Sequence, residues 1–95
     1  MAGPVHIIQT VVAEEFGITR EELLSPSRRN RFAHPRMIAV QLARELTKAG
    51  YSTIARKFSR HHTSILSAIR RVPDLLQAYP EYGIKRQAVL ARLQS

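Results

Sequence analysis

The stretch STIARKFSRHHTSILSAIRRV, residues 52–72, divides into two short segments, each with one apolar side, separated by a polar break. The apolar residues recur at the spacing of a helix face: Ile54, Ala55, Phe58, Ile65, Leu66 and Ile69. We predict a helix over 52–58, capped by Ser52. A tight break at 59–61 then leads into a second helix over 62–72. Two short helices joined in this way have the outline of a helix-turn-helix.

The second predicted helix begins with side chains that can bond to another molecule. Its N-terminal end carries hydrogen-bonding groups, and one more hydroxyl follows a turn later: Arg60, His61, His62, Thr63, Ser64 and Ser67. In a helix-turn-helix, such residues reach base edges in the major groove of duplex DNA. The methyl group of Thr63 can also pack on a thymine methyl. The alternative is structural, with one histidine capping the helix and the other only exposed.

Positive charge is concentrated in the middle of the chain. Residues 1–27 carry a net −3, residues 28–71 a net +10 and residues 72–95 a net +1. Twelve of the fifteen basic residues are arginine, which suits phosphate and guanine contacts. This distribution indicates a phosphate-binding surface, and a solvated basic face is the alternative. Arg70 and Arg71 fit both interpretations, because cations at a helix C-terminus also interact favourably with the helix dipole.

The N-terminal third of the chain predicts two helices and a loop. The first helix has apolar residues at three- and four-residue spacing: Ile7, Ile8, Val11, Val12 and Phe16. Gly17 is placed to end it. Thr19 and Glu22 have the spacing of a capping box, so a short second helix starts there and stops at Ser25-Pro26. The polar, arginine-rich stretch 25–34 is predicted to be a basic loop.

A long central helix is expected next. Pro35 suits its first turn, where the missing N–H is not needed. A buried stripe then continues to about Lys48: Ile38, Ala39, Leu42, Ala43 and Leu46. Gly50 is expected to end this helix before the helix-turn-helix begins.

The C-terminal segment completes an all-helical pattern. Pro73 is expected to interrupt the chain after the helix-turn-helix. Residues 74–94 are again helical in pattern, with a kink or break at Pro80 and Gly83. No alternating run bounded by turn residues predicts a strand. We therefore expect an all-α domain of five or six helices.

Length and composition limit the class of protein. Ninety-five residues suffice for a single small domain, 1–95, with one core. No apolar run approaches the roughly 20 residues that span a bilayer, and the N-terminal segment, with Glu14 and Glu15, lacks the basic start of a signal peptide. The absence of cysteine excludes disulfides, thiolate nucleophiles and cysteine metal sites. We expect a cytoplasmic protein.

The sequence predicts neither a metal site nor a catalytic site. His61 and His62 are adjacent and point about 100° apart on a helix. A third metal ligand and a carboxylate to orient an imidazole are both missing nearby. The glycines, Gly3, Gly17, Gly50 and Gly83, cannot form a phosphate-binding loop with Gly-Lys-Ser or Gly-Lys-Thr. We expect no cofactor, no small-molecule substrate and no enzymatic activity.

Three stretches resemble the C-terminal DNA-binding domain of the bacterial replication initiator DnaA: VVAEEFGITREELLSPSRR, PRMIAVQLARELT and IARKFSRHHTSILSAIRRV. They resemble that family's entry helix with its basic loop, its long central helix and its signature stretch. The resemblance covers about two-thirds of the chain, from Val12 to Val72. It implies a compact, Trp-repressor-like helical domain that contains a helix-turn-helix at about 52–72.

The resemblance also implies roles in binding a short asymmetric duplex element, the DnaA box. Arg28, in the basic loop, would enter the minor groove. The residues that would read bases in the adjacent major groove are His61, His62, Thr63 and Ser64. Arg44 would support binding from the central helix. From the basic and hydroxyl residues around the helix-turn-helix, we expect these contacts to the DNA backbone: Arg29, Arg31, Arg44, Lys48, Arg56, Lys57, Arg60 and Ser67.

The chain departs from the family pattern at several positions. His61 stands where the family has Asp. A carboxylate accepts from a cytosine amino group, whereas a neutral imidazole accepts or donates, so the base preferred there is open. Of the two usual family glycines, one is missing and Ser59 replaces the other, which can alter the turn. Pro26 and Ser27 occupy positions where the loop is usually basic.

We expect sequence-preferring binding of double-stranded DNA, in replication-initiation or transcription control, by a nucleoid-associated protein. The family's ATPase module has no room here, and the native-looking start favours a self-standing protein over an excised domain. The alternative is a protein-interaction adaptor with a DnaA-like fold and only non-specific DNA affinity. RNA binding is less favoured, because 6% of the residues are aromatic and Trp is absent. The preferred DNA sequence, the biological process and the oligomeric state are open.

Overall fold

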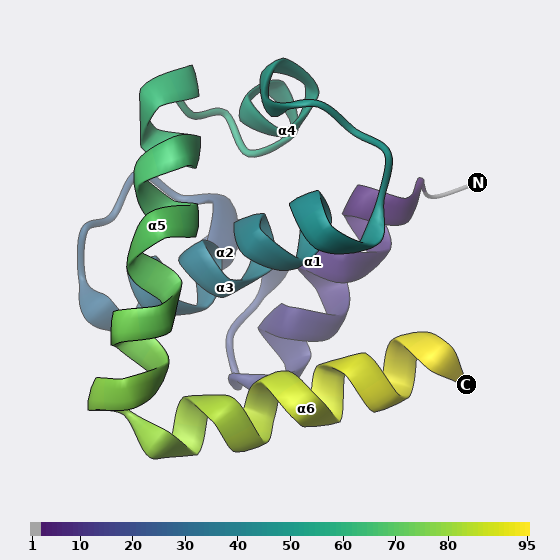
Figure 1. The fold of residues 1–95 in the computed structure, drawn as a ribbon, viewed down its shortest axis with the longest axis vertical. Helices are drawn as coiled ribbons and strands as arrows, with labels where there is room; N and C mark the ends of the chain where they lie inside the picture. Colours follow the sequence, from purple (N-terminus) through teal and green to yellow (C-terminus); the bar gives the residue numbers. More distant parts are fainter. Residues whose placement is uncertain (1–2) are drawn as a thin grey trace.

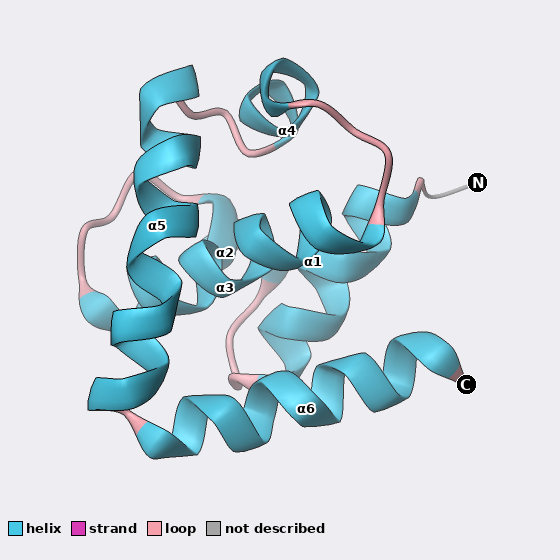
Figure 2. Ribbon diagram, viewed as in Figure 1, coloured by secondary structure: helices cyan, strands magenta, loops and turns pink. Residues whose placement is uncertain are grey.

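Six helices make up the described part of the chain, residues 3–95 of the computed structural model (Figure 1). They are α1 (Pro4–Glu15), α2 (Arg20–Leu24), α3 (Asn30–Leu46), α4 (Tyr51–Lys57), α5 (His62–Ala78) and α6 (Pro80–Gln94). Figure 2 shows helices joined by loops and no strand among these residues, which confirms the all-α prediction. The first two residues of the predicted domain 1–95 lie outside this range. Within it, every helix is too short or too polar to cross a membrane.

The N-terminal helices begin and end at the residues that local signals predict. α1 ends at Glu15 with Phe16 as its C-cap, and Gly17 follows with a φ of +70°, in the left-handed region that glycine adopts readily. Thr19 caps α2 with a complete capping box. The Glu22 N–H donates to Thr19 Oγ1 at 3.0 Å, and the Thr19 N–H donates to Glu22 Oε1 at 2.9 Å.

The central helix α3 begins earlier than predicted. It starts at Asn30, so Pro35 lies in its interior and the predicted loop 25–34 is helical in its second half. An interior proline removes the hydrogen bond to the carbonyl four residues earlier, that of Arg31. Arg31 is on the exposed surface, where solvent can reach that carbonyl, and the same turn buries His34. Burial of this turn therefore outweighs the local preference for a loop.

The connection between α3 and α4 also differs from the prediction. α3 ends at Leu46, which is 47% exposed instead of completing the buried stripe. α4 starts at Tyr51 with Gly50 as its N-cap, so Ser52 is not the cap. Helix α4 therefore has the length of the predicted 52–58 but begins one residue earlier, whereas α5 begins at the predicted residue and is longer than 62–72. Ile54 and Phe58 are fully buried, and they set the register of α4 against the core.

Helix α5 continues past the point where it was expected to stop. It runs through Pro73 to Ala78, because Val72 and Leu75, on either side of the proline, are both buried while Pro73 itself is exposed. The predicted break at Pro80 is confirmed, since Pro80 is the first residue of α6. Gly83 causes no break and lies within that helix.

The core lies around α3. This helix packs most extensively against α5 and then against α1, while α6 crosses beneath α1 at the end of α5 (Figure 1). The largest fully buried apolar side chains come from α2, α3, α4, α5 and the turn after α4: Leu23, Ile38, Leu42, Ile54, Phe58 and Ile65. The two helices of the helix-turn-helix therefore rest on the same core as the long central helix.

Candidate nucleic-acid interface

The turn between α4 and α5 closes with serine at its left-handed position. Ser59 has a φ of 52° and is the one residue besides glycine with positive φ among residues 3–95. Its N–H donates to the Arg56 carbonyl at 3.2 Å, and the Arg60 N–H donates to the Ala55 carbonyl at 2.9 Å. These two bonds are those of a Schellman motif, which glycine usually completes. The turn that Ser59 was expected to alter is therefore formed, although a side chain costs some strain there.

His61 is the N-cap of α5. Its Nδ1 accepts from the Thr63 N–H at 3.3 Å and lies 2.9 Å from Thr63 Oγ1. The structural interpretation, in which one of the two histidines caps the helix, is confirmed for His61. Base reading by His61 stays a prediction. The ring is exposed, and the cap engages only Nδ1, so Nε2 is accessible to another molecule.

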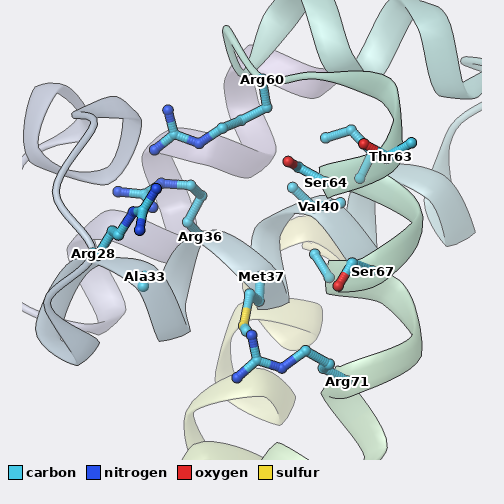
Figure 3. Close-up of a pocket in the computed structure, with 12 residues that line it drawn as sticks. Arg28, Ala33, Arg36, Met37, Val40, Arg60, Thr63, Ser64, Ser67 and Arg71 are labelled. Carbon is cyan, nitrogen blue, oxygen red and sulfur yellow. The ribbon is translucent and has the colours of Figure 1, made fainter.

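A groove of about 500 Å³ lies between α5 and the first half of α3, with Arg28, from the loop that leads into α3, also in its lining. Four arginines and three hydroxyl residues line it: Arg28, Arg36, Arg60, Arg71, Thr63, Ser64 and Ser67. In Figure 3 the arginines of the loop, of α3 and of the turn point into the groove from one side, opposite Ser64 and Ser67 on α5. Five of the predicted contact residues therefore lie around one groove. Arg36 and Arg71 are additional.

Arg36 holds the basic loop in place and was missed by sequence reasoning. It is 8% exposed, and its Nε donates to the Leu23 carbonyl at 2.7 Å. Its Nη2 donates to the carbonyls of Ser25, at 2.7 Å, and Ser27, at 3.1 Å. Arg28 follows directly after these anchored residues. The available signal was the helical period, which places position 36 on the buried face one turn before Ala39 and Val40.

Arg60 is bonded to the same loop. Its Nη2 donates to the Ser25 carbonyl that Arg36 also uses. Burial, and then the positive charge of Arg60, lower the pKa of Arg36 to about 10, so the Arg36 guanidinium is still charged at neutral pH. Two cations thus share a carbonyl. Among residues 3–95, no carboxylate lies within 4.0 Å of either cation.

The ion pairs of the described residues lie elsewhere. Arg86 on α6 pairs with Glu45 at 2.7 Å, and Arg92 pairs with Glu14 and Glu15 on α1. None of the basic residues of the groove has an acidic partner in residues 3–95. The positive charge around the groove is therefore uncompensated within the part of the chain that the structure describes.

The other predicted contact residues surround the helix-turn-helix without lining the groove. The exposed cations among them are Arg29, Arg31, Arg44, Lys48, Arg56 and Lys57. Arg44 lies 4.3 Å over the ring of Tyr51, and its Nη1 donates to the Ala49 carbonyl at 3.2 Å. The Tyr51 ring centroid is 6.0 Å from that of His62. Arg44 therefore supports the ring against which His62 lies.

A buried glutamine fixes the end of α4. Gln9 is 1% exposed, and its Nε2 donates to the Lys57 carbonyl at 3.1 Å. Its Oε1 accepts from Arg20 Nε at 3.0 Å. Gln9 therefore links α1 and α2 to the last residue of α4, and the side chain of Lys57 is exposed. Sequence reasoning did not single out this residue.

His34 lies away from His61 and His62, the two histidines at the start of α5. It is buried beside α6, with its Nδ1 3.0 Å from Tyr82 Oη. Burial, and then the positive charge of Arg71, lower the pKa of His34. The rings of Tyr79 and Tyr82 stack with their centroids 4.8 Å apart, and both pack against the core. No group of three or more His, Asp or Glu residues within 3–95 could hold a metal ion.

Comparison with known proteins gives one consistent result. The family described as "Bacterial dnaA protein helix-turn-helix" matches residues 5–72. The chain is 38% identical to the chromosomal replication initiator protein DnaA of Agrobacterium fabrum over 83% of its own length and 16% of the relative. It is 38% identical to the DnaA protein of Acinetobacter baylyi, over 96% of its own length and 20% of the relative. It is 40% identical to that of Thermus thermophilus, over 81% of its own length and 18% of the relative. The chain thus spans a fifth or less of these relatives.

Proposed function

Because the chain belongs to the bacterial DnaA helix-turn-helix family, we propose that it binds double-stranded DNA with a sequence preference and acts in replication initiation. The observation that carries this proposal is the groove between α5, α3 and Arg28 of the basic loop. Its arginines lack acidic partners among the described residues and lie opposite the hydroxyl groups of α5. Such a surface is complementary to a phosphate backbone flanked by base edges.

The shape of the groove supports a two-point docking of the duplex. The N-terminal end of α5 enters the major groove, where His62, Thr63 and Ser64 contact base edges. Arg28 enters the adjacent minor groove. The DNA backbone that separates the major from the minor groove would then lie in the protein groove, between α5 on one side and α3 with the loop on the other.

Arg36 and Arg60 have a specific reason to attract that strand. Their guanidinium groups share the Ser25 carbonyl, and each charge disfavours the other. A phosphate between them would relieve the repulsion and form charge-assisted hydrogen bonds. Arg71 and Ser67 lie farther along the same groove, where they would contact the next phosphate.

The remaining cations orient the duplex. Arg56 and Lys57 are exposed at the end of α4, the helix that crosses the backbone in this motif. Arg29, Arg31, Arg44 and Lys48 extend the positive surface on either side of the two helices. These contacts strengthen binding to any duplex and carry no base information. The domain would thus act by binding, not by catalysis, on chromosomal DNA in the cytoplasm.

Selection of bound duplexes from a random library tests this function. The purified chain is incubated with the library at near-physiological salt, because affinity for non-specific DNA rises steeply as salt falls. Enrichment of one asymmetric, DnaA-box-like element supports the proposal. Salt-sensitive binding with no enriched element would contradict it and would favour a protein-interaction role with non-specific DNA affinity.

A further inference from the structure

We propose that His61 determines specificity as a hydrogen-bond donor, and that it selects against cytosine at the base it contacts. This inference rests on the proposed DNA-binding function. It concerns one atom, Nε2 of the imidazole, on the exposed side of the residue that caps α5.

The cap determines which ring nitrogen carries hydrogen. A backbone N–H can only donate, so Nδ1 must accept from the Thr63 N–H at 3.3 Å and is unprotonated. The neutral ring therefore carries its hydrogen on Nε2. A doubly protonated ring would carry hydrogen there as well. In either form, Nε2 is a donor.

The Thr63 hydroxyl is oriented by the same nitrogen. Thr63 Oγ1 lies 2.9 Å from Nδ1, and since Nδ1 is unprotonated, the hydroxyl must donate in this contact. The lone pairs of Oγ1 then remain available to accept from a base. His61 and Thr63 thus present a donor and an acceptor side by side at the start of α5.

The base preference follows from the donor and acceptor pattern of the major groove. Guanine presents O6 and N7 there, adenine N7 and thymine O4, and all of these accept from Nε2. Cytosine presents only the N4 amino group, which is a donor. A cytosine at the contacted position would therefore place two donors against each other, whereas guanine offers two acceptors.

Two short substitutions of equal size separate this donor role from the capping role. Both His61→Asp and His61→Asn keep an oxygen that caps α5, because Asp and Asn are favoured N-cap residues. The second oxygen of Asp can only accept, and the amide nitrogen of Asn can only donate. The pair therefore differs in the polarity of the outward-facing atom while the cap is retained.

The experiment measures dissociation constants for the wild-type chain and both variants. The probes are the duplex element enriched by the wild-type chain and every single-base-pair change of it. At one position, we expect the wild type and His61→Asn to bind cytosine about fivefold more weakly than guanine. His61→Asp should reverse this preference there and leave the other positions unchanged. Thermal unfolding close to that of the wild type in both variants would show that the cap is retained.

Two results would overturn the inference, and they are distinguishable. If His61→Asp has the wild-type preference at every position, His61 does not select by donation, and sequence-preferring DNA binding stands without it. If the wild-type chain discriminates at no position, the proposed function fails and the inference fails with it.

Discussion

Arginines on the two sides of this domain are held in different ways. On the α6 side, Arg86 and Arg92 pair with glutamates of α3 and α1. On the groove side, Arg36 and Arg60 donate to backbone carbonyls, and their charges have no acidic partner among the described residues. A carbonyl satisfies the N–H groups of an arginine without cancelling its charge. The comparison shows how a fold can immobilise cations and still leave them attractive to an anion.

The two kinds of contact also differ in what they contribute to stability. Exposed ion pairs are worth only about 0–1 kcal/mol, because water and salt screen them. Arg36 is buried and bonds to carbonyls of the α2–α3 connection. Losing a buried partner leaves groups unsatisfied at a cost of about 1–3 kcal/mol. The groove side is therefore expected to be the more sensitive to substitution.

The largest effect is expected at Arg36. The substitution Arg36→Met keeps much of the side-chain length and removes all donors. We expect it to lower the free energy of unfolding, measured with urea, by about 3 kcal/mol, and to weaken DNA binding by freeing the loop that carries Arg28. Arg36→Lys is the control and should give an intermediate loss. Stability of Arg36→Met within about 0.5 kcal/mol of the wild type would show that the carbonyl contacts do not anchor the loop.

Thr63 and Lys57 test which contacts on the groove side carry base information. Thr63→Val keeps the shape and removes the hydroxyl, so it should cost about 1–3 kcal/mol on the preferred duplex and little on others. Lys57→Ala is the matched comparison. It should weaken binding to all duplexes alike and reduce the salt slope by about one. If both substitutions affected every duplex equally, Thr63 would not be a base-reading residue.

The pH dependence of stability tests the α6 side at His34. Burial and the charge of Arg71 lower the pKa of His34 below 6.5, so the unfolded chain binds a proton that the folded chain resists. Acid therefore favours unfolding. The free energy of unfolding should begin to fall as the pH drops through about 6.5, by at most about 1.4 kcal/mol per pH unit. It should stop falling once the pH is below the pKa of His34 in the folded state. Above that window, the ring is neutral in both states and has no effect.

Thermal or urea unfolding between pH 7 and pH 5 measures this effect. In His34→Gln the additional loss of stability in acid should be absent, whatever the substitution does to stability at pH 7. An identical pH dependence in the variant and the wild type would exclude His34 as its source.

The smallest effect is expected at the ion pair of α6. Arg86→Gln removes the bond to Glu45, and the Glu45 side chain is 54% exposed. We expect a loss of about 0.5 kcal/mol in stability and no change in DNA affinity, measured on the same duplexes as for Thr63. A clear loss of affinity would mean that the α6 side also contacts DNA, and that the contrast between the two sides is wrong.

Much of the candidate site could be predicted from the sequence because the signals are local. The capping box of Thr19 and Glu22 lies within four residues, and so does the break at 59–61 between α4 and α5. The hydroxyl residues at the head of α5 follow from the same break. The spacing of apolar residues and the residues that start or stop a helix are signals that span only a few positions. The helix-turn-helix could therefore be located from the sequence, with errors at its ends.

The sequence by itself determined the all-α class, the order of the helices and the residues at the head of α5. Only the tertiary structure decided that helices pass through Pro35 and Pro73, and that Arg36 anchors the basic loop. An interior proline costs about 3 kcal/mol locally, and this cost is outweighed by buried contacts such as that of His34 with Tyr82, 48 positions away. Packing between residues distant in sequence contributes to no local pattern, and for that reason these features had to be observed.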